Sequence, residues 1–348
     1  MSDAAPVGTD AILSTRLTRL LGVRHPVLNA PMGDTAGGRL AAAVTAGGGL
    51  GFVGGGYGDR DWLDRELDLT AGARIGVGFV TFALESDDGA LRAALDARPA
   101  AVQLSFGDPR PHADVVHAAG ALLLCGVQTD DEVDRALEAG ADVLVAQGSD
   151  AGGHGRRGPS TMAVLPSLRD RVGDVPVVAA GGIGDGRGLL AALALGADGA
   201  SMGTRFLATE EAITTAPERR AVVAASAFDT VRTEAFDIVR GPSWPADHDG
   251  RVVRNRFVDE WESGCDLELA IQRYSASAVD DVDVRPVWAG ESVGVVHGIG
   301  RAADVLEAIM AEVSVALRAL EGMQLHGSHG GPVVDVAIDD DVDEPVPT

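Results

Sequence analysis

Eight short apolar runs recur through the first 208 residues of the 348-residue chain, and segments with helical spacing separate them. The starts of consecutive runs are 21 to 32 residues apart, about the length of one strand, one helix and two short loops. This alternation favours a parallel sheet whose strands are covered on both faces by helices. The runs are residues 27–32, 50–56, 74–84, 101–107, 122–127, 143–148, 175–183 and 199–208.

The segments between the runs carry helical patterns. In residues 130–142, Val133, Ala136 and Leu137 recur at the spacing that puts them on one face of a helix. Residues 301–323 repeat such a pattern over a longer stretch, with apolar side chains mostly on one side. We expect this last helix to complete the eighth strand–helix unit.

Eight such units indicate an α/β fold, a (β/α)8 TIM barrel with an inserted, mostly helical lid subdomain. A doubly wound open sheet is the alternative, but most runs end in glycine or a polar residue, which suits loops gathered on one barrel face. The strand rhythm stops after residue 208, and the next 82 residues hold three of the four tryptophans. We therefore predict a barrel from 14–208 and 291–325, a lid from 209–290, and an acidic flexible tail from 326–348.

Composition removes several classes of function. The formal net charge of −24 argues against nucleic acid or an anionic membrane as a partner. All 28 basic residues are arginine, which excludes lysine Schiff bases, pyridoxal phosphate enzymes and P-loop nucleotide hydrolysis. Cys125 and Cys265 lie outside any metal-ligand spacing, so we predict neither a disulfide framework nor a metal site. With no signal-peptide pattern, a cytoplasmic location is expected, and the acidic, lysine-free composition would also suit high salt.

Glycines follow the seventh and eighth runs, where strands turn into helices. Gly181 and Gly182 end the first of these turns, and Gly203 and Thr204 lie in the second. Without Cβ atoms, backbone N–H groups can close on an anion, and these two loops form the usual phosphate site of such barrels. Tight turns alone also favour glycine, and this simpler explanation stays open. The pattern resembles a dinucleotide fingerprint only loosely and comes late in the series, which argues against a Rossmann site.

A single histidine follows the sixth run, in the stretch AQGSDAGGHGRRG at residues 146–158. Gly152 and Gly153 would let the backbone of His154 pass close to a flat ligand. An imidazole with a pKa near ~6.5 suits proton removal from a carbon acid at neutral pH. No nucleophile motif of the G-x-S-x-G type competes with it. His154 is therefore a candidate base, although an incidental loop histidine without a visible partner is the alternative.

The stretch QGSDAGGH resembles the signature of the nitronate monooxygenases, formerly called 2-nitropropane dioxygenases. The similarity continues through residues 28–57, 177–209 and 292–309, in the same order as in that family. The resemblance implies a TIM barrel that binds FMN without a covalent bond. It also implies FMN-dependent oxidation of alkyl nitronates or nitroalkanes by O2 to carbonyl compounds and nitrite, so the expected partners are a small-molecule substrate and O2.

The resemblance assigns roles to individual residues. His154 would remove the α-proton of a neutral nitroalkane, a step that anionic nitronates do not need. Residues after the first strand would line the flavin ring, residues of the sixth unit would contact it, and the last two strands would hold the phosphate. The expected cofactor-binding residues are Ala30, Pro31, Met32, Gln128, Gln147, Gly152, Gly153, Gly181, Gly182, Met202, Gly203, Thr204 and Arg205.

Two departures from the family pattern concern substrate choice. Many relatives carry Val-Asn in the third strand, with the Asn meeting the flavin, where this chain has Val77-Gly78-Phe79. We expect Phe79 or Thr81 to reshape that wall. The signature usually has Glu at the position of Asp150, which keeps the charge but shortens its reach.

The motifs are shared with flavin-dependent enoyl-acyl carrier protein reductases and NADH:quinone reductases. An FMN-dependent NAD(P)H reductase of an enoyl thioester or quinone is therefore the alternative function, and a flavin-binding protein without turnover is a third hypothesis. The sequence leaves the oligomeric state open, a homo-oligomer included. It assigns no role to Arg156 and Arg157.

Overall fold

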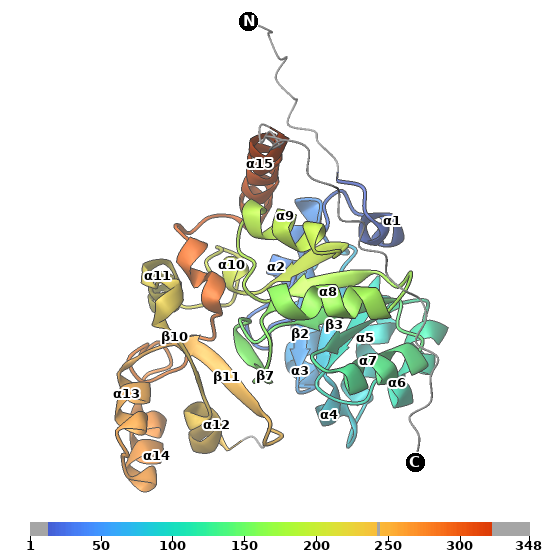
Figure 1. The fold of residues 1–348 in the computed structure, drawn as a ribbon. Helices are drawn as coiled ribbons and strands as arrows, with labels where there is room; N and C mark the ends of the chain where they lie inside the picture. The colour runs from blue at the N-terminus through green and yellow to red at the C-terminus, as the bar shows by residue number, and fades with distance from the viewer. Residues whose placement is uncertain (1–12, 242–243, 322–348) are drawn as a thin grey trace, which may run out of the picture.

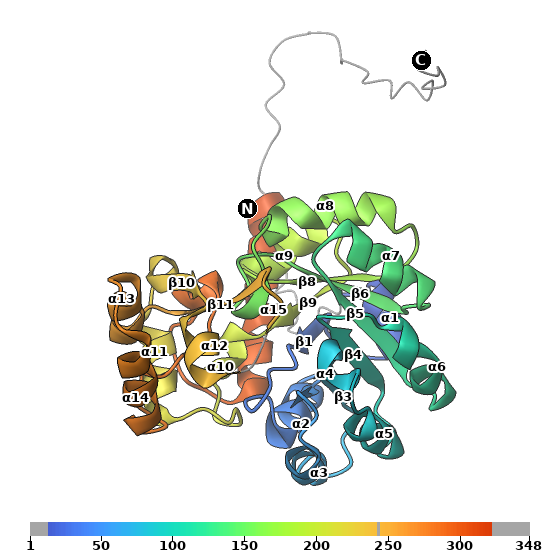
Figure 2. The ribbon, with the colours of Figure 1, turned by 90° about the horizontal axis from the view of Figure 1, so that it is seen from below.

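The computed structural model describes residues 13–241 and 244–321, and eight parallel strands form its central sheet. Their order is β1-β9-β8-β6-β5-β4-β3-β2, and a parallel bridge between Leu28 and Leu50 joins the two ends of the sheet. The sheet closes almost completely into a barrel (Figure 2), which confirms the predicted (β/α)8 fold. Its strands are β1 Val27–Asn29, β2 Phe52–Gly56, β3 Gly76–Val80, β4 Ala101–Ser105, β5 Leu122–Val127, β6 Val143–Gln147, β8 Val177–Ala180 and β9 Gly199–Met202.

Helices surround the barrel (Figure 1). The long helix α15 packs beside α9 and α2, so it completes the ring after β9. The peptide backbones meet directly there, because a Cβ on Gly186 would lie 2.4 Å from the carbonyl oxygen of Ile309. The helices of the barrel are α1 Arg16–Leu21, α2 Gly38–Ala46, α3 Arg60–Asp68, α4 Thr81–Leu84, α5 Gly89–Asp96, α6 Arg110–Ala118, α7 Asp130–Glu138, α8 Thr161–Arg171, α9 Gly186–Ala194, α10 Thr204–Leu207 and α15 Ala302–Glu321.

Each predicted apolar run contains one barrel strand, and in seven of the eight the strand is shorter than the run, while β5 coincides with its run. The third run shows why: β3 stops at Val80, and Thr81 already begins α4. Helix starts follow ordinary capping chemistry. Thr129, for example, accepts a hydrogen bond from the amide of Glu132, and three acidic residues occupy the first turn of α7.

Apolar side chains close the N-terminal end of the barrel. Leu28, Phe52, Leu124 and Leu17 of α1 belong to one fully buried cluster there. Phe52 occupies the space that a side chain at Gly76 would need, since a Cβ on Gly76 would lie 2.3 Å from its ring. The opposite end, where the strands terminate, is left for binding and catalysis.

The segment 209–290 contributes a second, smaller sheet. Its strands β10 (Thr230–Thr233) and β11 (His248–Val253) pair antiparallel, and β11 also pairs with β7 (Gly153–Arg156) from the loop after β6. The sequence pattern predicted a mostly helical segment here and did not indicate this sheet. The other elements between β9 and α15 are α11 Ala216–Ala224, η1 Ala227–Asp229, α12 Ala235–Arg240, α13 Arg256–Glu262, α14 Leu267–Ala276 and η2 Glu291–Val295.

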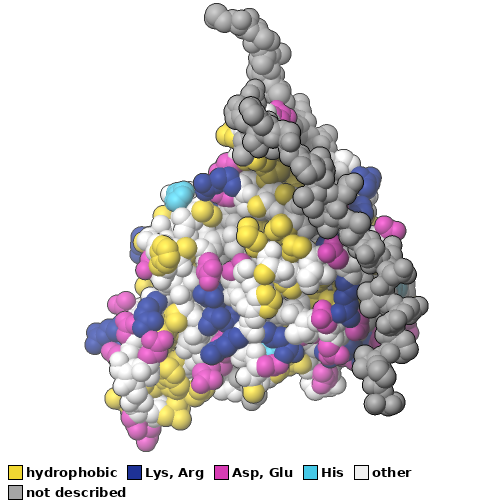
Figure 3. All heavy atoms as spheres, viewed as in Figure 1, with side chains coloured by type: hydrophobic (Ala, Val, Ile, Leu, Met, Phe, Trp, Pro, Cys, Tyr) yellow, Lys and Arg dark blue, Asp and Glu magenta, His cyan; other side chains and the backbone are white. Residues whose placement is uncertain are grey.

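The limits of the barrel and lid stay predictions, and the predicted tail at 326–348 lies outside the described residues. Among helices of the described ranges, none combines the length and apolar character needed to cross a membrane. On the face shown in Figure 3, basic and acidic side chains are interspersed.

Candidate active site

His154 lies on strand β7, where it pairs with Gly250 of β11. The residue follows the C-terminal end of the barrel strand β6, and this part of the connecting segment is itself a short strand. Gly153 has φ 69°, a conformation that favours glycine. A Cβ on Gly250 would lie 2.1 Å from the ring of Trp288, so glycine at this position lets Trp288 pack against the strand.

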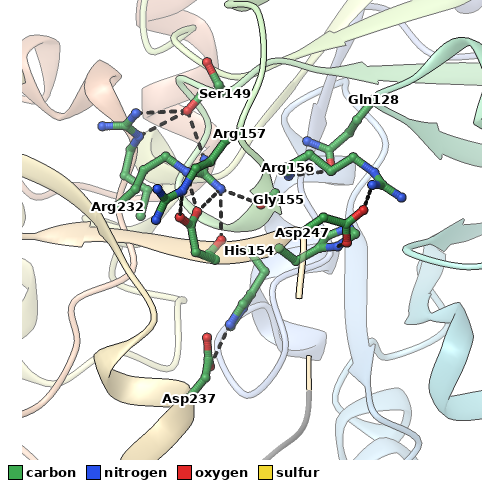
Figure 4. Close-up of polar contacts among 12 residues, drawn as sticks. Gln128, Ser149, His154, Gly155, Arg156, Arg157, Arg232, Asp237 and Asp247 are labelled. Carbon is green, nitrogen blue, oxygen red and sulfur yellow. Dashed lines mark hydrogen bonds and ion pairs between the residues drawn. The ribbon is translucent and has the colours of Figure 1, made fainter. Parts of the chain in front are cut away.

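The imidazole of His154 is held from three sides. Its Nε2 lies 2.8 Å from Oδ1 of Asp237 on α12 (Figure 4). Trp244 stacks parallel to the ring, with centroids 3.9 Å apart and an interplanar angle of 2°, and Trp288 approaches at 4.8 Å. Only 11% of the His154 side chain and 10% of the Asp237 side chain are exposed. Packing and a polar contact together orient the ring.

Aromatic side chains form a wall around Trp244. Its Nε1 donates to the hydroxyl of Tyr57 at 2.7 Å, and Phe82 and Phe106 each meet it edge-on at 5.1 Å between centroids. Phe106 has φ 64°, an uncommon conformation for a bulky residue and a cost that functional sites often carry. The wall makes one approach to His154 apolar.

Two arginines of the inserted segment clamp the loop that carries His154. Arg232 donates to the carbonyl oxygens of Ser149, at 3.1 Å, and of Gly155, at 2.5 Å (Figure 4). Arg251 also donates to Ser149, at 3.0 Å. Asp249, which is 6% exposed, balances the charge of Arg232 at 2.5 Å. Guanidinium groups suit this task because their donors form a rigid fork.

Arg156 and Arg157, which had no role from sequence, extend the same network. Arg156 pairs with Glu132 of α7 at 3.0 Å and with Asp247, and Arg157 pairs with Asp249 at 2.5 Å. Both therefore tie β7 to neighbouring elements through charge.

His248 is the second histidine near the site. Burial, followed by the charge of Arg156, lowers its pKa to about 4, and its Nδ1 contacts Asp247 at 2.8 Å. The ring is therefore neutral at pH 7, which leaves His154 as the residue oriented by a buried carboxylate.

The two predicted glutamines hold β7 in place. Gln147 donates from Nε2 to the carbonyl oxygen of His154 at 2.9 Å. Gln128 accepts from the amide of Arg156 at 3.2 Å, and its Nε2 lies 3.4 Å from the carbonyl oxygen of Gln147. Their expected contact with a flavin stays a prediction, while the contacts present orient the strand of the candidate base.

The residues expected to line the flavin ring meet at the ends of β1 and β9. The amide of Ala30 donates to the carbonyl oxygen of Met202 at 2.9 Å. A Cβ on Gly203 would lie 3.4 Å from the sulfur of Met32, and one on Gly78 would lie 2.3 Å from Cβ of Pro31. The side chain of Met202 is buried in the apolar core that the barrel strands form with the surrounding helices, so only its backbone is available to a ligand.

The expected phosphate site has a cation with unused hydrogen-bonding capacity. Nη1 of Arg205 is buried and has no hydrogen-bond partner among the described residues. Burial lowers the pKa of Arg205, while the charges of Glu312 and Asp185 raise it. Gly181 and Gly182 have φ 112° and 65°, so the turn after β8 requires glycine.

Asp150 and Thr204 fix the loops around that turn. Asp150 accepts from the Thr161 hydroxyl at 2.7 Å, and a Cβ on Gly181 would lie 2.4 Å from its Oδ1. Thr204 accepts from the amide of Gly290 at 2.9 Å. A Cβ on Gly152 would lie 2.4 Å from that same amide nitrogen, so Gly152 allows the two loops to touch.

Of the two residues expected to reshape the third-strand wall, Phe79 does not face the site. Its ring packs in the apolar core between the barrel strands and the surrounding helices, close to Gly55. Thr81 has a buried hydroxyl without a partner in the described part of the chain, so it stays a candidate.

Asp237, Trp244 and Arg232 were not predicted from the sequence. All three lie in the inserted segment, 78 to 90 positions after His154, and none belongs to a recognisable motif. Within residues 13–241 and 244–321, no group of three His, Cys, Asp or Glu side chains is arranged to hold a metal ion.

An almost closed barrel with a carboxylate-paired histidine and glycine turns at the ends of its last two strands has the architecture of a TIM-barrel enzyme. The family model described as "Nitronate monooxygenase" matches residues 14–73 and 68–312. The chain belongs to the nitronate monooxygenase family.

Individual relatives agree with this assignment. Nitronate monooxygenase of Neurospora crassa is 32% identical over 346 residues, covering 86% of this chain and 92% of the relative. Among solved structures, FabK from Thermotoga maritima matches with a TM-score of 0.78 and 30% identity, over 89% of this chain and 99% of that one. Nitroalkane oxidase from Streptomyces ansochromogenes matches with a TM-score of 0.73 and 30% identity, over 87% and 99%.

The arginine clamp predicts a large cost for losing Arg232. Arg232→Met keeps the aliphatic stem but removes this donor from the carbonyl oxygens of Gly155 and Asp249 and takes one partner from the Asp249 carboxylate. We expect the free energy of unfolding, measured with urea, to fall by about 3 kcal/mol, as for other broken buried ion pairs. Arg256→Met, which breaks an exposed pair with Glu260, should cost less than about 1 kcal/mol. Equal effects of the two substitutions would contradict the clamp.

Proposed function

We propose that the protein catalyses FMN-dependent oxidation of alkyl nitronates and nitroalkanes by O2 to carbonyl compounds and nitrite. Family membership and the likeness to nitroalkane oxidase support this class of substrate. The observation that carries the proposal is the setting of His154, whose imidazole is oriented by Asp237 and two tryptophans at the catalytic end of the barrel.

The residues around the site fit FMN. Arg205 offers a buried guanidinium N–H without a partner in the described part of the chain, which is what a phosphate would use. Gly181 and Gly182, in the turn after β8, are at least partly exposed, and Ala30 to Met32 provide a small, partly exposed and mostly apolar surface for a flat ring. When bound, FMN would supply the electron transfer that no side chain here provides.

His154 would act on neutral nitroalkanes. It takes the proton from the carbon next to the nitro group, and the electron pair of the broken C–H bond moves into the nitro group to give the nitronate. Trp244, which packs against Tyr57, Phe82 and Phe106, covers one face of the imidazole with apolar surface and limits the access of water from that side. A substrate that arrives as the nitronate bypasses the base.

The second candidate is an FMN-dependent NAD(P)H reductase of an enoyl thioester or quinone. The likeness to FabK, with the higher TM-score of 0.78, favours keeping it. The two candidates differ in the electron donor: a nitronate in the first and a pyridine nucleotide in the second.

Replacement of His154 should affect turnover of the neutral nitroalkane and of the preformed nitronate differently. For His154→Asn we expect kcat/KM for neutral nitroethane to fall by about 10²-fold or more, the usual contribution of a general base. Turnover of the preformed nitronate should stay close to wild type in steady-state assays of O2 consumption. His117→Asn, on exposed surface of α6, serves as the control. An equal loss with both substrates would refute the assignment of His154 as the base.

The phosphate assignment can be measured without turnover. We expect Arg205→Met to weaken FMN binding to the apoprotein by roughly 10- to 100-fold, because a charge-assisted hydrogen bond contributes about 1.5–3 kcal/mol. Riboflavin, which has no phosphate, should bind the variant and the wild type equally in flavin fluorescence titrations. Arg254→Met, an exposed pair on the inserted segment, is the matched control. Equal weakening of FMN and riboflavin would show that Arg205 does not serve the phosphate.

A further inference from the structure

The carboxylate that contacts His154 comes from a separate part of the chain. Asp237 lies on α12, 83 positions after the histidine, and its Oδ1 is 2.8 Å from Nε2. Both side chains are about nine-tenths buried. The stretches that carry the sequence resemblance, residues 28–57, 147–154, 177–209 and 292–309, do not include this aspartate.

Helix α12 is held by packing at its buried face, which fixes the position of Asp237 relative to the imidazole of His154. Phe236 and Val239 of the same helix are buried in the core of the inserted segment with Phe257. The amide of Gly241 closes the helix by donating to the carbonyl oxygen of Asp237 at 2.9 Å, and Gly241 has φ 89°. The carboxylate therefore has a fixed place from which to orient the imidazole.

We propose that Asp237 is a positioning residue that holds the neutral imidazole of His154 in its Nε2–H tautomer and so makes Nδ1 the proton-accepting atom. An ionised carboxylate can only accept, so the hydrogen between Oδ1 and Nε2 belongs to the imidazole. The lone pair of the neutral ring is then on Nδ1. Trp244, stacked on one face of the ring, prevents the rotation that would exchange the two nitrogens.

This arrangement deepens the proposed function and rests on it. In the proton transfer, the C–H bond of the nitroalkane breaks, an N–H bond forms at Nδ1, and the electron pair moves into the nitro group. The imidazolium that results carries a positive charge, and the carboxylate of Asp237 stabilises it across the Nε2–H bond. No proton transfer to Asp237 is required.

Other titratable groups near the pair do not take this role. His248 on β11 is neutral at pH 7, because burial lowers its pKa to about 4. Burial also raises the pKa of Tyr57, and Trp244 lies between its hydroxyl and the site. Arg240 and Asp34 influence Tyr57 from a distance, without a contact to His154. Asp237 is thus the charged group in direct contact with the imidazole.

The first test compares Asp237→Ala and Asp237→Glu with the matched control Asp259→Ala, an exposed aspartate of the inserted segment. With flavin-loaded protein, we expect Asp237→Ala to lower kcat for neutral nitroethane by about 10²-fold, with KM little changed and nitronate turnover retained. The acidic side of its pH–rate profile, where the base becomes protonated and activity falls, should move to lower pH, because the imidazolium loses its counter-charge. Asp237→Glu should recover part of the rate. Equal loss with both substrates, or wild-type rates in Asp237→Ala, would overturn the proposal.

The tautomer can be read without substrate or turnover. In 15N-labelled wild-type protein, at a pH high enough to leave the imidazole neutral, the ring of His154, assigned by its absence in His154→Asn, should show a protonated Nε2 and a bare Nδ1. A protonated Nδ1 would overturn the proposal even if the Asp237 variants failed to fold. If instead wild-type protein does not oxidise nitroalkanes or nitronates, the proposed function fails while the tautomer result stands by itself.

Discussion

The antiparallel pairing of β7 with β11 is the constraint on which the candidate active site depends. It holds His154 opposite Gly250, and the side chains that orient the imidazole come from elements next to that pairing. Arg232 and Arg251 close the same contact by donating to the carbonyl oxygens of Ser149 and Gly155. A glycine-rich segment with little side-chain packing of its own thereby acquires a defined position, and its glycines serve close approach rather than mobility.

The barrel could be predicted because parallel strands are buried on both faces and read as continuous apolar runs. The same rule explains why β7 was missed: its sequence GHGR has no apolar run and no alternation, and it becomes a strand only through β11, some 95 positions later. Long-range pairing of this kind leaves no local periodicity. Asp237 was missed for a related reason, since a single aspartate in an amphipathic helix looks like ordinary surface charge until the fold brings it to His154.

The glycines of the site allow close packing, and its arginines supply hydrogen bonds and positive charge. Gly78 and Gly250 lie where the ring of a neighbouring Pro31 or Trp288 occupies the space of a Cβ. In a chain without lysine, each cation near the site is a planar guanidinium, which can satisfy two carbonyl or carboxylate oxygens at once. Arg205 differs from Arg232 in having a buried N–H without a partner in the described residues, which separates the expected phosphate site from the clamp.

Oxidation of a nitronate and reduction by a pyridine nucleotide would use the same barrel, so the electron donor decides between them. The direct measurement is anaerobic mixing of the purified, flavin-loaded protein with propyl-2-nitronate, NADH and NADPH in separate experiments, followed by flavin absorbance. Rapid loss of the oxidised flavin spectrum with propyl-2-nitronate, and none with either pyridine nucleotide, is the predicted result. Rapid bleaching by NADH or NADPH with none by the nitronate would contradict the proposed oxidation chemistry.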